Sequence, residues 1–372
     1  MAKIISLVSY PFLPAKVGGQ KGVALFNKYF CRYHDLTCVT TKNNDPTAAE
    51  GYEVLNILSN SSLRYINIFY FFTIRKIILQ KKATHLLLEH PYYGWLGLLL
   101  KYFCGVKLII HSHNIEGLRW KTLGKWWWPV LLQYEKMAHQ AANYNFFIHD
   151  ADRAFAVREF RLRESACLTV TYGIEWSVPP TMQERLLAKD KLQKIFHISQ
   201  DTVILLFNGA FNYSPNLHAL RMITEQINPL LQKQKNFPYK ILICGRDIPR
   251  EVSEGNFPDI SFAGFVDDIS LFFKGADIFI NPVTEGGGIK TKLVEALGYN
   301  MNAVSTENGA IGIQKAWCCN KLMTCADNDW SGFVQQILKV STIAADTPPV
   351  YYENFYWGFT AKKAAAFIES KS

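Results

Sequence analysis

Long apolar runs, paired cysteines and dense charge are all scarce in this 372-residue sequence, and each scarcity excludes a class of protein. No segment reaches the roughly eighteen uncharged apolar residues of a membrane span. Arg64 and Arg75 bracket one candidate, and Glu89 with Pro91 interrupts another. The eight cysteines include no CxxC pair, and the start MAKIISLVSY has no apolar stretch of signal-peptide length. We therefore expect a cytoplasmic protein that does not span a bilayer.

The composition indicates a well-folded chain with room for two domains. Hydrophobic residues make up 49% and charged residues only 19% of the sequence, which leaves little scope for disorder. No internal repeat or low-complexity tract is visible. The formal net charge is +9, but there is neither a basic run nor a recognisable nucleic-acid module. We expect no nucleic-acid partner.

The most informative segment is Ala276–Leu297, which joins a strand, a glycine loop and a helix start. Ile278–Ile280 predicts a buried strand, and Thr291–Leu297 predicts a helix with one apolar face. Gly286, Gly287 and Gly288 lie between them, followed by Lys290 and Lys292. Glycines let backbone amides approach a ligand, and a helix start favours anions. The segment therefore predicts a diphosphate site, although either lysine could instead be an ordinary surface residue.

This spacing fits neither a Walker loop nor a dinucleotide fingerprint. It resembles the nucleotide-sugar loop of the family 4 glycosyltransferases with the GT-B fold, in the branch whose motif is Gly-Gly-Gly-x-x-x-Lys-x-x-Glu-Ala. The matching residues are Gly286, Gly287, Gly288, Lys292, Glu295 and Ala296. The usual family pattern has an earlier glutamate where Gly287 stands. The resemblance then leaves Glu285 to hold donor-sugar hydroxyls, as a catalytic residue.

Strands and helices alternate along the chain, which argues for an α/β protein with parallel sheets. The resemblance implies a GT-B fold, with two Rossmann-like doubly wound domains facing across a cleft. We expect an acceptor-binding domain over residues 1–175 and a nucleotide-sugar-binding domain over 195–350. A C-terminal helix, 358–372, is expected to cross back to the first domain. The polar segment from Glu175 to about His197 is the expected connection.

The resemblance also implies a set of donor-binding residues. These are Gly18, Gly19, Gly209, Arg246, Val266, Gly286, Gly287, Gly288, Ile289, Lys290, Lys292 and Glu295. Glu295 would bind the ribose hydroxyls. The Arg and Lys that commonly follow the Gly209 position in this family are absent, so Lys290 and Lys292 are expected to supply the charge, with Arg246 as a weaker third.

In the first half, the run from Ile109 to Glu116 ends a buried strand and projects polar groups where open sheets bind ligands. By the resemblance, His113 is catalytic, at the reacting sugar, and the acceptor-binding residues are Asn114, Glu116, Arg119 and Trp120. His111 and His113 could alternatively bind a metal. No third ligand is identifiable in the sequence, so we expect no metal, and His111 is better explained as a hydrogen-bonded histidine.

Two acidic motifs are more simply explained as helix caps than as metal ligands. Asp150-Ala151-Asp152 looks like a metal-binding Asp-x-Asp, but it follows a strand and precedes a helical stretch. We therefore expect Asp150 to cap that helix, and the Asp327–Asp329 run to cap the helix that begins near Trp330. No cofactor is expected.

Cations stand beside indoles at Arg119–Lys121 and Lys125–Trp128. This pairing suits the headgroup layer of an anionic membrane, at its inner face, but it equally suits a partly buried acceptor site. Both explanations remain open.

The resemblance implies a retaining glycosyltransferase. It would move a sugar from a nucleotide-diphosphate donor to a glycan or lipid-linked acceptor hydroxyl, in surface polysaccharide or glycoconjugate synthesis. The alternatives are a GT-B sugar-nucleotide epimerase and a donor-binding or scaffold homologue with weak catalysis.

Overall fold

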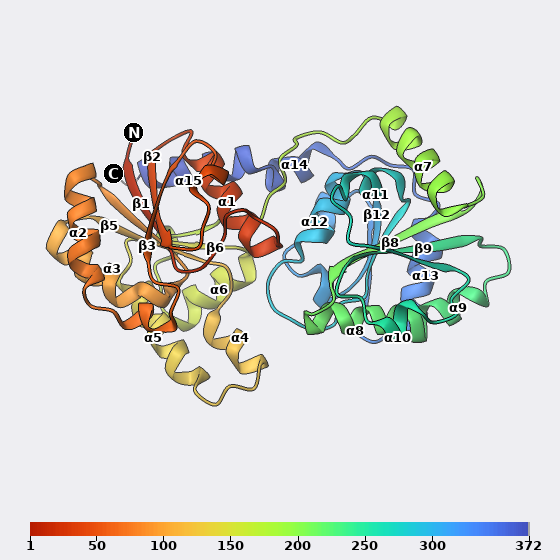
Figure 1. Cartoon of the computed structure of the whole chain (residues 1–372), viewed down its shortest axis with the longest axis horizontal. Coiled ribbons are helices and arrows are strands. Elements are labelled where there is room, and N and C mark those ends of the chain that lie inside the picture. The colour runs from red at the N-terminus through yellow and green to blue at the C-terminus, as the bar shows by residue number, and fades with distance from the viewer. Residues whose placement is uncertain (371–372) are drawn as a thin grey trace. The chain divides into compact units, whose positions relative to one another are not determined.

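The computed structural model describes residues 1–370 and divides into two compact units. The first unit contains Met1–Glu175 and the residues from Asn354 on, and the second contains Trp176–Glu353 (Figure 1). Residues 371 and 372, at the end of the expected C-terminal helix, lie outside the described residues.

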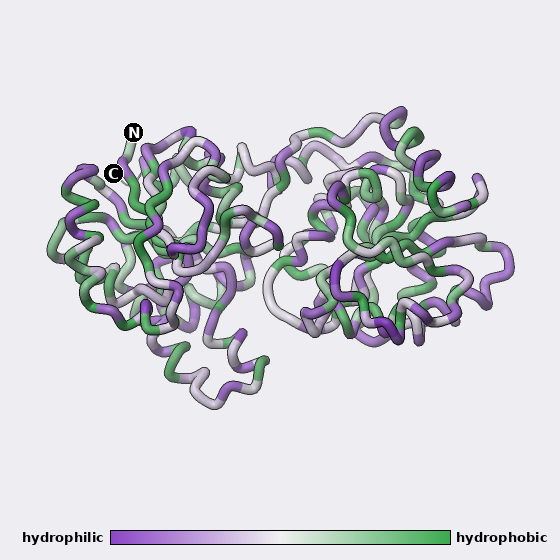
Figure 2. The backbone as a smooth tube through the Cα atoms, viewed as in Figure 1, coloured by the Kyte–Doolittle hydropathy of each residue, from purple (hydrophilic) through white to green (hydrophobic). Residues whose placement is uncertain are grey.

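A seven-stranded sheet forms the centre of the first unit. Its strands are β1 (Lys3–Val8), β2 (Asp35–Thr41), β3 (Glu53–Leu58), β4 (His85–Glu89), β5 (Lys107–Ser112), β6 (Tyr144–Phe147) and β7 (Cys167–Thr169). Their order is β3-β2-β1-β4-β5-β6-β7, and every pairing is parallel. The middle residues of the central strands β4 and β5 are apolar, and both strands are almost wholly buried, as expected for a sheet covered on both faces (Figure 2).

Within residues 1–370, seven helices belong to the first unit. They are α1 (Gly18–Phe30), α2 (Tyr70–Lys81), α3 (Gly94–Cys104), α4 (Glu116–Thr122), α5 (Trp128–Ala141), α6 (Asp150–Glu159) and α15 (Trp357–Glu369), with short 3-10 turns η1 (Pro46–Ala48), η2 (Ser62–Ile66), η3 (Pro91–Tyr93) and η4 (Glu164–Ala166). α15, from the end of the chain, packs against α1 near its start. The buried Trp357 ring lies 5.7 Å from Tyr172 and 6.4 Å from Phe26.

The second unit is built on a six-stranded parallel sheet. Its strands are β8 (Val203–Ala210), β9 (Tyr239–Arg246), β10 (Ile260–Gly264), β11 (Ile278–Asn281), β12 (Asn302–Thr306) and β13 (Leu322–Cys325), in the order β10-β9-β8-β11-β12-β13. Its helices are α7 (Met182–Phe196), α8 (Ser214–Met222), α9 (Asn228–Gln232), α10 (Arg250–Ser253), α11 (Ser270–Gly275), α12 (Thr291–Gly298), α13 (Trp330–Val340) and α14 (Pro349–Phe355), whose end passes into the first unit, with short turns η5 (Ile223–Ile227), η6 (Asn308–Ala310) and η7 (Lys315–Trp317).

Each sheet has one point where the strand order reverses. In the first unit the chain leaves β1 toward β2 on one side and reaches β4 on the other. In the second unit the corresponding neighbours are β8 and β11. Open parallel sheets bind ligands beyond the carboxyl ends of the strands at such a point. The fold therefore marks one candidate position in each unit.

Of the two helix caps predicted from the sequence, one is confirmed and one is wrong. The cap of α6 is His149, whose Nδ1 accepts a hydrogen bond from the Asp152 amide, so the expectation that Asp150 caps this helix was wrong. Asp150 is instead the first helical residue and accepts a hydrogen bond from the Thr169 hydroxyl. The expected cap of α13 is confirmed, because the Asp329 carboxylate accepts from the Gly332 amide at 2.8 Å.

Candidate functional site

The glycine loop, residues 284–290, begins from a fixed point at the end of β11. The Asn281 side-chain amide donates to Ser305 Oγ at 2.9 Å and to the Gly309 carbonyl at 3.0 Å. The Thr306 hydroxyl donates to the carbonyl of Val283. The first residues after the strand are thus held by β12 and η6, so the loop starts in a defined direction.

Glycine is required at two positions in this loop. Gly286 has φ +85° and Gly288 has φ +74°, in the left-handed region that residues with a Cβ avoid. A Cβ on Gly286 would also lie 3.1 Å from the Tyr213 hydroxyl. Gly287 is exposed, and Ile289 is half-buried. These positive φ values explain why glycine occupies positions 286 and 288 of the loop.

Lys290 holds the loop from inside. Its Nζ donates to the carbonyl of Gly286 at 2.8 Å and to that of Gly288 at 3.1 Å. Burial lowers the pKa of this ammonium to about 8. Among residues 1–370, no acceptor is found for the backbone N–H groups of residues 286–289. The loop thus directs carbonyls toward Lys290 and leaves a row of amide donors for an anion.

Lys292 joins the helix start to the neighbouring strand. It lies in the first turn of α12, and its Nζ donates to the Asn208 carbonyl at 2.6 Å, at the end of β8. Both lysines are therefore part of the β8–β11 strand ends, and the alternative that one is an ordinary surface lysine is wrong. Glu295 lies one turn further along α12 and is half-buried.

The other donor residues predicted in the second unit lie at the same edge of the sheet. Gly209, Arg246 and Val266 follow or end the adjacent strands β8, β9 and β10. The β8 and β9 backbones approach so closely that a Cβ on Gly245 would lie 1.7 Å from the Gly209 carbonyl oxygen. The exposed Arg246 guanidinium lies 5.3 Å from the Phe265 ring centre. Glu285 is exposed within the loop.

Gly18 and Gly19 belong to the first unit, where they begin α1 after the loop that follows β1. A Cβ on Gly19 would meet nothing within 4 Å. Open space beside a helix start is compatible with a ligand, but their assignment to the donor stays a prediction.

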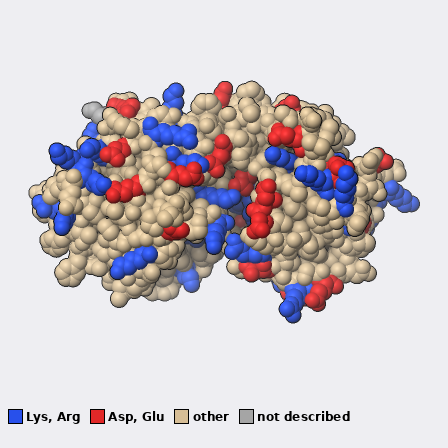
Figure 3. Space-filling view, turned by 45° about the horizontal axis from the view of Figure 1, so that its top comes forward, with Lys and Arg blue, Asp and Glu red and all other residues tan. Residues whose placement is uncertain are grey.

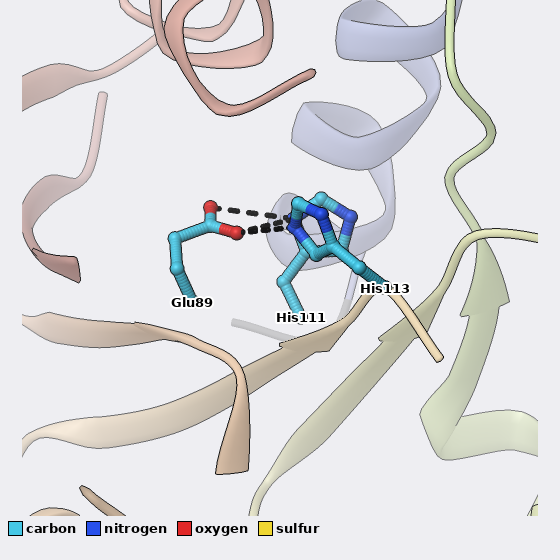
Figure 4. A group of neighbouring side chains, drawn as sticks. All are labelled: Glu89, His111 and His113. Carbon is cyan, nitrogen blue, oxygen red and sulfur yellow. Dashed lines mark hydrogen bonds and ion pairs between the residues drawn. The ribbon is translucent and has the colours of Figure 1, made fainter. Parts of the chain in front are cut away.

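The reversal point of the first sheet carries a buried carboxylate that faces two adjacent histidines (Figure 4). Val8, Glu89 and His111 are register neighbours at the ends of β1, β4 and β5. Glu89 Oε2 lies 2.7 Å from His113 Nε2 and 3.1 Å from His111 Nδ1. All three side chains are buried, so the negative charge is shared in a nearly dry environment.

The histidines keep Glu89 ionised. Burial by itself raises the pKa of the Glu89 carboxyl, but the charges of His111 and His113 and their hydrogen bonds outweigh burial and hold the pKa well below its usual range. The expectation that no third metal ligand accompanies the two histidines was wrong, since one donor atom from each of these residues lies within 4.8 Å of the others. Two imidazoles and a carboxylate could also coordinate a cation such as Zn²⁺.

The predicted acceptor residues form a network around Glu116. This buried carboxylate accepts from the Tyr92 hydroxyl at 2.6 Å and from Arg119 Nη1 at 3.1 Å, and Trp120 Nε1 donates to the same Tyr92 hydroxyl at 3.4 Å. Burial raises the pKa of Glu116, but His90, Tyr92 and Arg119 together lower it to about 2. Asn114 is half-buried just before α4. The structure therefore connects Glu116, Arg119 and Trp120.

The sequence analysis did not identify His90. This residue lies between the carboxylate of Glu116 and the ring of His113, which in turn pairs with Glu89. Its φ is +71°, a strained value for a histidine. Its ring lies 4.5 Å from that of His113, and its Nδ1 lies 3.2 Å from Glu116 Oε1. Burial lowers the pKa of His90, with the neighbouring His113 as a second cause. A strained residue at a strand end is typical of a functional site.

Glu135 supports this network from α5. Its carboxylate accepts from the backbone N–H groups of Glu116 and Gly117, each at 3.0 Å, which fixes the start of α4. Burial raises the pKa of Glu135 to about 8 and that of Asp152, on α6, to about 7. Glu135 was not predicted, because it lies 19 and 18 residues from the two amides that it contacts, and Asp152 was considered only as part of a possible metal motif.

Comparisons with known proteins identify similar sequences and similar folds. Residues 202–342, most of the second unit, match the family described as glycosyl transferases group 1. The prediction of a glycosyltransferase agrees with this match, which includes the glycine loop and both lysines.

A chitobiosyldiphosphodolichol beta-mannosyltransferase from Debaryomyces hansenii is 26% identical over 246 residues, 60% of this chain and 52% of the relative. An uncharacterized 44.6 kDa protein in the cps region of Klebsiella pneumoniae is 27% identical over 117 residues, 29% of this chain and 30% of the relative. The chain thus spans about half, or less, of the curated relatives that it matches.

Solved structures confirm the predicted α/β fold. HepE from Anabaena in complex with UDP superposes with a TM-score of 0.75 at 13% identity, covering 99% of this chain and 100% of the other. A glycosyltransferase from Rickettsia africae gives a TM-score of 0.72 at 14% identity, covering 99% and 98%. At such identity the likeness concerns the fold alone.

Proposed function

We propose that this protein transfers a sugar from a nucleotide-diphosphate donor to a hydroxyl of a glycan or lipid-linked acceptor, with retention at the anomeric carbon. One observation carries the proposal: a rigid loop at the β8–β11 reversal point presents the N–H groups of residues 286–289 beside Lys290 and Lys292. The UDP in the complex of the HepE structure and the lipid-linked name of the Debaryomyces relative support the donor and acceptor classes.

In this proposal the diphosphate is the leaving group. The bond from the anomeric carbon to the diphosphate oxygen breaks, and a bond to the acceptor oxygen forms. The proton of the acceptor hydroxyl passes to the departing diphosphate oxygen, and the nucleoside diphosphate leaves. Amides and lysines that are already in position stabilise the charge that develops on the departing oxygen, without reorganising water. Glu295 binds the ribose hydroxyls, and Arg246, Gly209 and Val266 line the nucleotide side.

The side chains of the first unit take the remaining roles. His113 contacts the reacting sugar and Glu89 orients its ring, while Asn114, Glu116, Arg119 and Trp120 bind the acceptor. Gly18 and Gly19 approach the donor, and Glu285 holds donor-sugar hydroxyls. No metal or cofactor is required, because the loop itself supplies the positive charge that a divalent ion would otherwise bring to the diphosphate.

The setting is proposed as the cytoplasmic side of a membrane, in surface polysaccharide or glycoconjugate synthesis. Among the described residues, no helix has both the length and the apolar character to cross a bilayer. Lysines and arginines are interspersed with acidic side chains on the face drawn in Figure 3. This mixture does not favour a nucleic-acid partner, and we retain an anionic membrane as the charged partner.

The test is donor turnover with a panel of nucleotide sugars, measured with and without acceptor. The cognate donor is expected to raise the melting temperature, and sugar release is expected to require the acceptor. Proton NMR of the product reports retention from the anomeric coupling. Isomerisation without acceptor would indicate an epimerase, and donor binding without turnover would indicate a scaffold.

A further inference from the structure

One surface of the first unit exposes apolar side chains more densely than the rest of the chain. Ten of the 24 large apolar side chains exposed among the described residues fall between Leu63 and Phe103. The α2–α3 face is defined here by six of them, which are 59–81% exposed: Ile66, Ile68, Phe69, Phe72, Tyr102 and Phe103. An exposed apolar area of this kind usually marks an interaction site.

The α2–α3 face is continuous across two helices. α2 and α3 pack side by side in the first unit (Figure 1). The Phe71 ring lies 5.3 Å from Phe72 and 5.5 Å from Phe103, whose ring lies 5.1 Å from Tyr102. The opposite sides of the helices bury Ile74 and Leu96 in the core. The helices are therefore apolar on a second side that the core does not use.

The charge in the segments that carry this face is positive, although Lys81 at the end of α2 is paired with Glu53 of β3. Residues 61–82 and 94–107 contain seven lysines and arginines and no acidic residue. Arg75 and Lys76 are exposed and follow Phe72 by three and four residues, so they lie on the same side of α2, and Lys82 is exposed at its end. Apolar side chains bordered mainly by cations complement one kind of surface best, an apolar layer under anionic headgroups.

We infer that the α2–α3 face docks on a bilayer that contains anionic lipids. The aromatic and aliphatic side chains enter the boundary between headgroups and acyl chains, and the cations bind the headgroups. A second copy of the chain fits less well, because a two-fold contact would place like charges opposite each other. The inference extends the membrane contact of the proposed function, and it places that contact away from the Trp120–Trp128 segment.

A hollow on this face adds to the argument. It has a volume of about 440 Å³ and is lined by Leu63, Ile66, Ile68 and Phe69, together with Arg64 and polar groups of the η2 region. Apolar walls with a cation at the edge suit part of a lipid whose headgroup is anionic. The α2–α3 face thus combines an exposed apolar surface with a hollow that suits part of a lipid.

Vesicle co-sedimentation of the full chain tests the inference without donor or acceptor. The wild type is expected to bind vesicles of equimolar phosphatidylcholine and phosphatidylglycerol, and to bind pure phosphatidylcholine weakly. The variant Ile68→Ser/Phe69→Ser/Phe72→Ser is expected to partition about tenfold less or worse. The variant Arg75→Gln/Lys76→Gln/Lys82→Gln is expected to lose about fivefold for each charge removed.

Two controls make the result specific. Leu186→Ser/Leu187→Ser/Ile195→Ser removes three equally exposed apolar side chains from α7 of the second unit, and it is expected to leave vesicle binding unchanged. Trp126→Ser removes the most exposed tryptophan of the other candidate segment, with the same expectation. Circular dichroism confirms that each variant is folded.

Three outcomes would overturn the inference. The first is a wild type that ignores anionic vesicles, and the second is loss of binding with Trp126→Ser while the α2–α3 variants still bind. The third is self-association through this face, seen by sedimentation velocity, without vesicle binding. Because nucleotide-sugar stabilisation is measured separately, the membrane inference can fail while the proposed function stands, and the reverse is equally visible.

Discussion

The two units carry polar groups at the same topological position but present them in different ways. In the second unit the β8–β11 ends offer unpaired main-chain N–H groups at the surface, shaped by Gly286, Gly288 and Lys290. In the first unit the corresponding β1–β4–β5 ends bury the Glu89 carboxylate, which is already paired with His111 and His113. The site in the second unit can therefore accept the charge of a bound anion. The site in the first unit depends instead on the contacts among its own buried side chains.

Removing Glu89 should produce the largest effect, because the two buried histidines would lose the carboxylate with which both are paired. Glu89→Ala is expected to cost about 3–5 kcal/mol of unfolding free energy in urea, and turnover is expected to fall with it. Glu89→Gln, which keeps one acceptor oxygen, should cost clearly less. An alanine variant as stable as the wild type would show that the pairing does not stabilise the fold.

The same residue gives a pH test whose sign follows from its pKa. Because the folded state lowers the pKa of Glu89, its stabilisation is fully present above the ordinary glutamate pKa and is lost as pH falls through the folded value. The gap in unfolding free energy between wild type and Glu89→Gln should therefore narrow in acid. A gap that widens in acid would refute the assignment.

Loss of Lys292 should be the largest effect in the second unit. Lys292→Met removes a charge-assisted donor and is expected to cost about 1.5–3 kcal/mol of donor binding, roughly 10–100-fold in kcat/KM. Lys315→Met, at an exposed lysine of the same unit, is the matched control and should leave kcat/KM unchanged. Equal kinetics for the two variants would remove Lys292 from the site.

The loop backbone is expected to be less sensitive than the charges. Gly286→Ala forces a side chain into φ +85° and toward Tyr213, at a cost of about 1–2 kcal/mol. Gly287→Ala, which lies between the two left-handed glycines, is the control for an added methyl group. Thermal unfolding and donor titration should both separate the two variants, and identical behaviour would argue against the loop geometry.

Lys290 should make donor binding pH-dependent. Its pKa of about 8 implies that affinity for an anionic donor declines above pH 8, by at most tenfold per pH unit, as the ammonium loses its proton. Between pH 8 and the ordinary lysine pKa, this lysine is protonated in the unfolded chain but largely deprotonated in the folded protein. Its contribution therefore makes the free energy of unfolding rise with pH in this range. Opposite trends in affinity and stability, measured by calorimetry and urea unfolding, are the expected signature. Lys290→Arg, which stays charged, should lack the decline.

Metal removal is expected to have the smallest effect. If the loop alone neutralises the diphosphate, dialysis against EDTA should leave kcat and the melting temperature unchanged. Loss of activity that Zn²⁺ restores, and that Glu89→Gln abolishes, would instead assign the Glu89–His111–His113 group to a cation.

The central strands and the glycine loop were predictable because their signals are local. Buried parallel strands are continuous apolar runs, and the loop with its flanking strand and helix lies within 22 residues of sequence, Ala276–Leu297. The outermost strands β3 and β13 give a weaker apolar pattern, because several of their residues are only half-buried.

The side-chain network of the first unit was only partly predictable. His113, Glu116, Arg119 and Trp120 follow one strand, but Glu89 ends another strand and meets His113 only through the sheet register. In the sequence, Glu89 stands out only as a charge that interrupts an apolar run. The sequence also could not predict that the Lys290 side chain points toward the carbonyls of its own loop, because that orientation depends on the backbone conformation of Gly286 and Gly288.

Hydrogen exchange of the glycine loop on UDP binding tests the central claim most directly. Mass spectrometry of a peptide covering residues 284–292 reports the amides of residues 286–289 with and without UDP. These amides are expected to exchange fast in the free protein and to become strongly protected with UDP, but not in Lys292→Met at the same concentration. Protection confined to other segments, or none at all under saturating UDP, would contradict the assignment of this loop to the diphosphate.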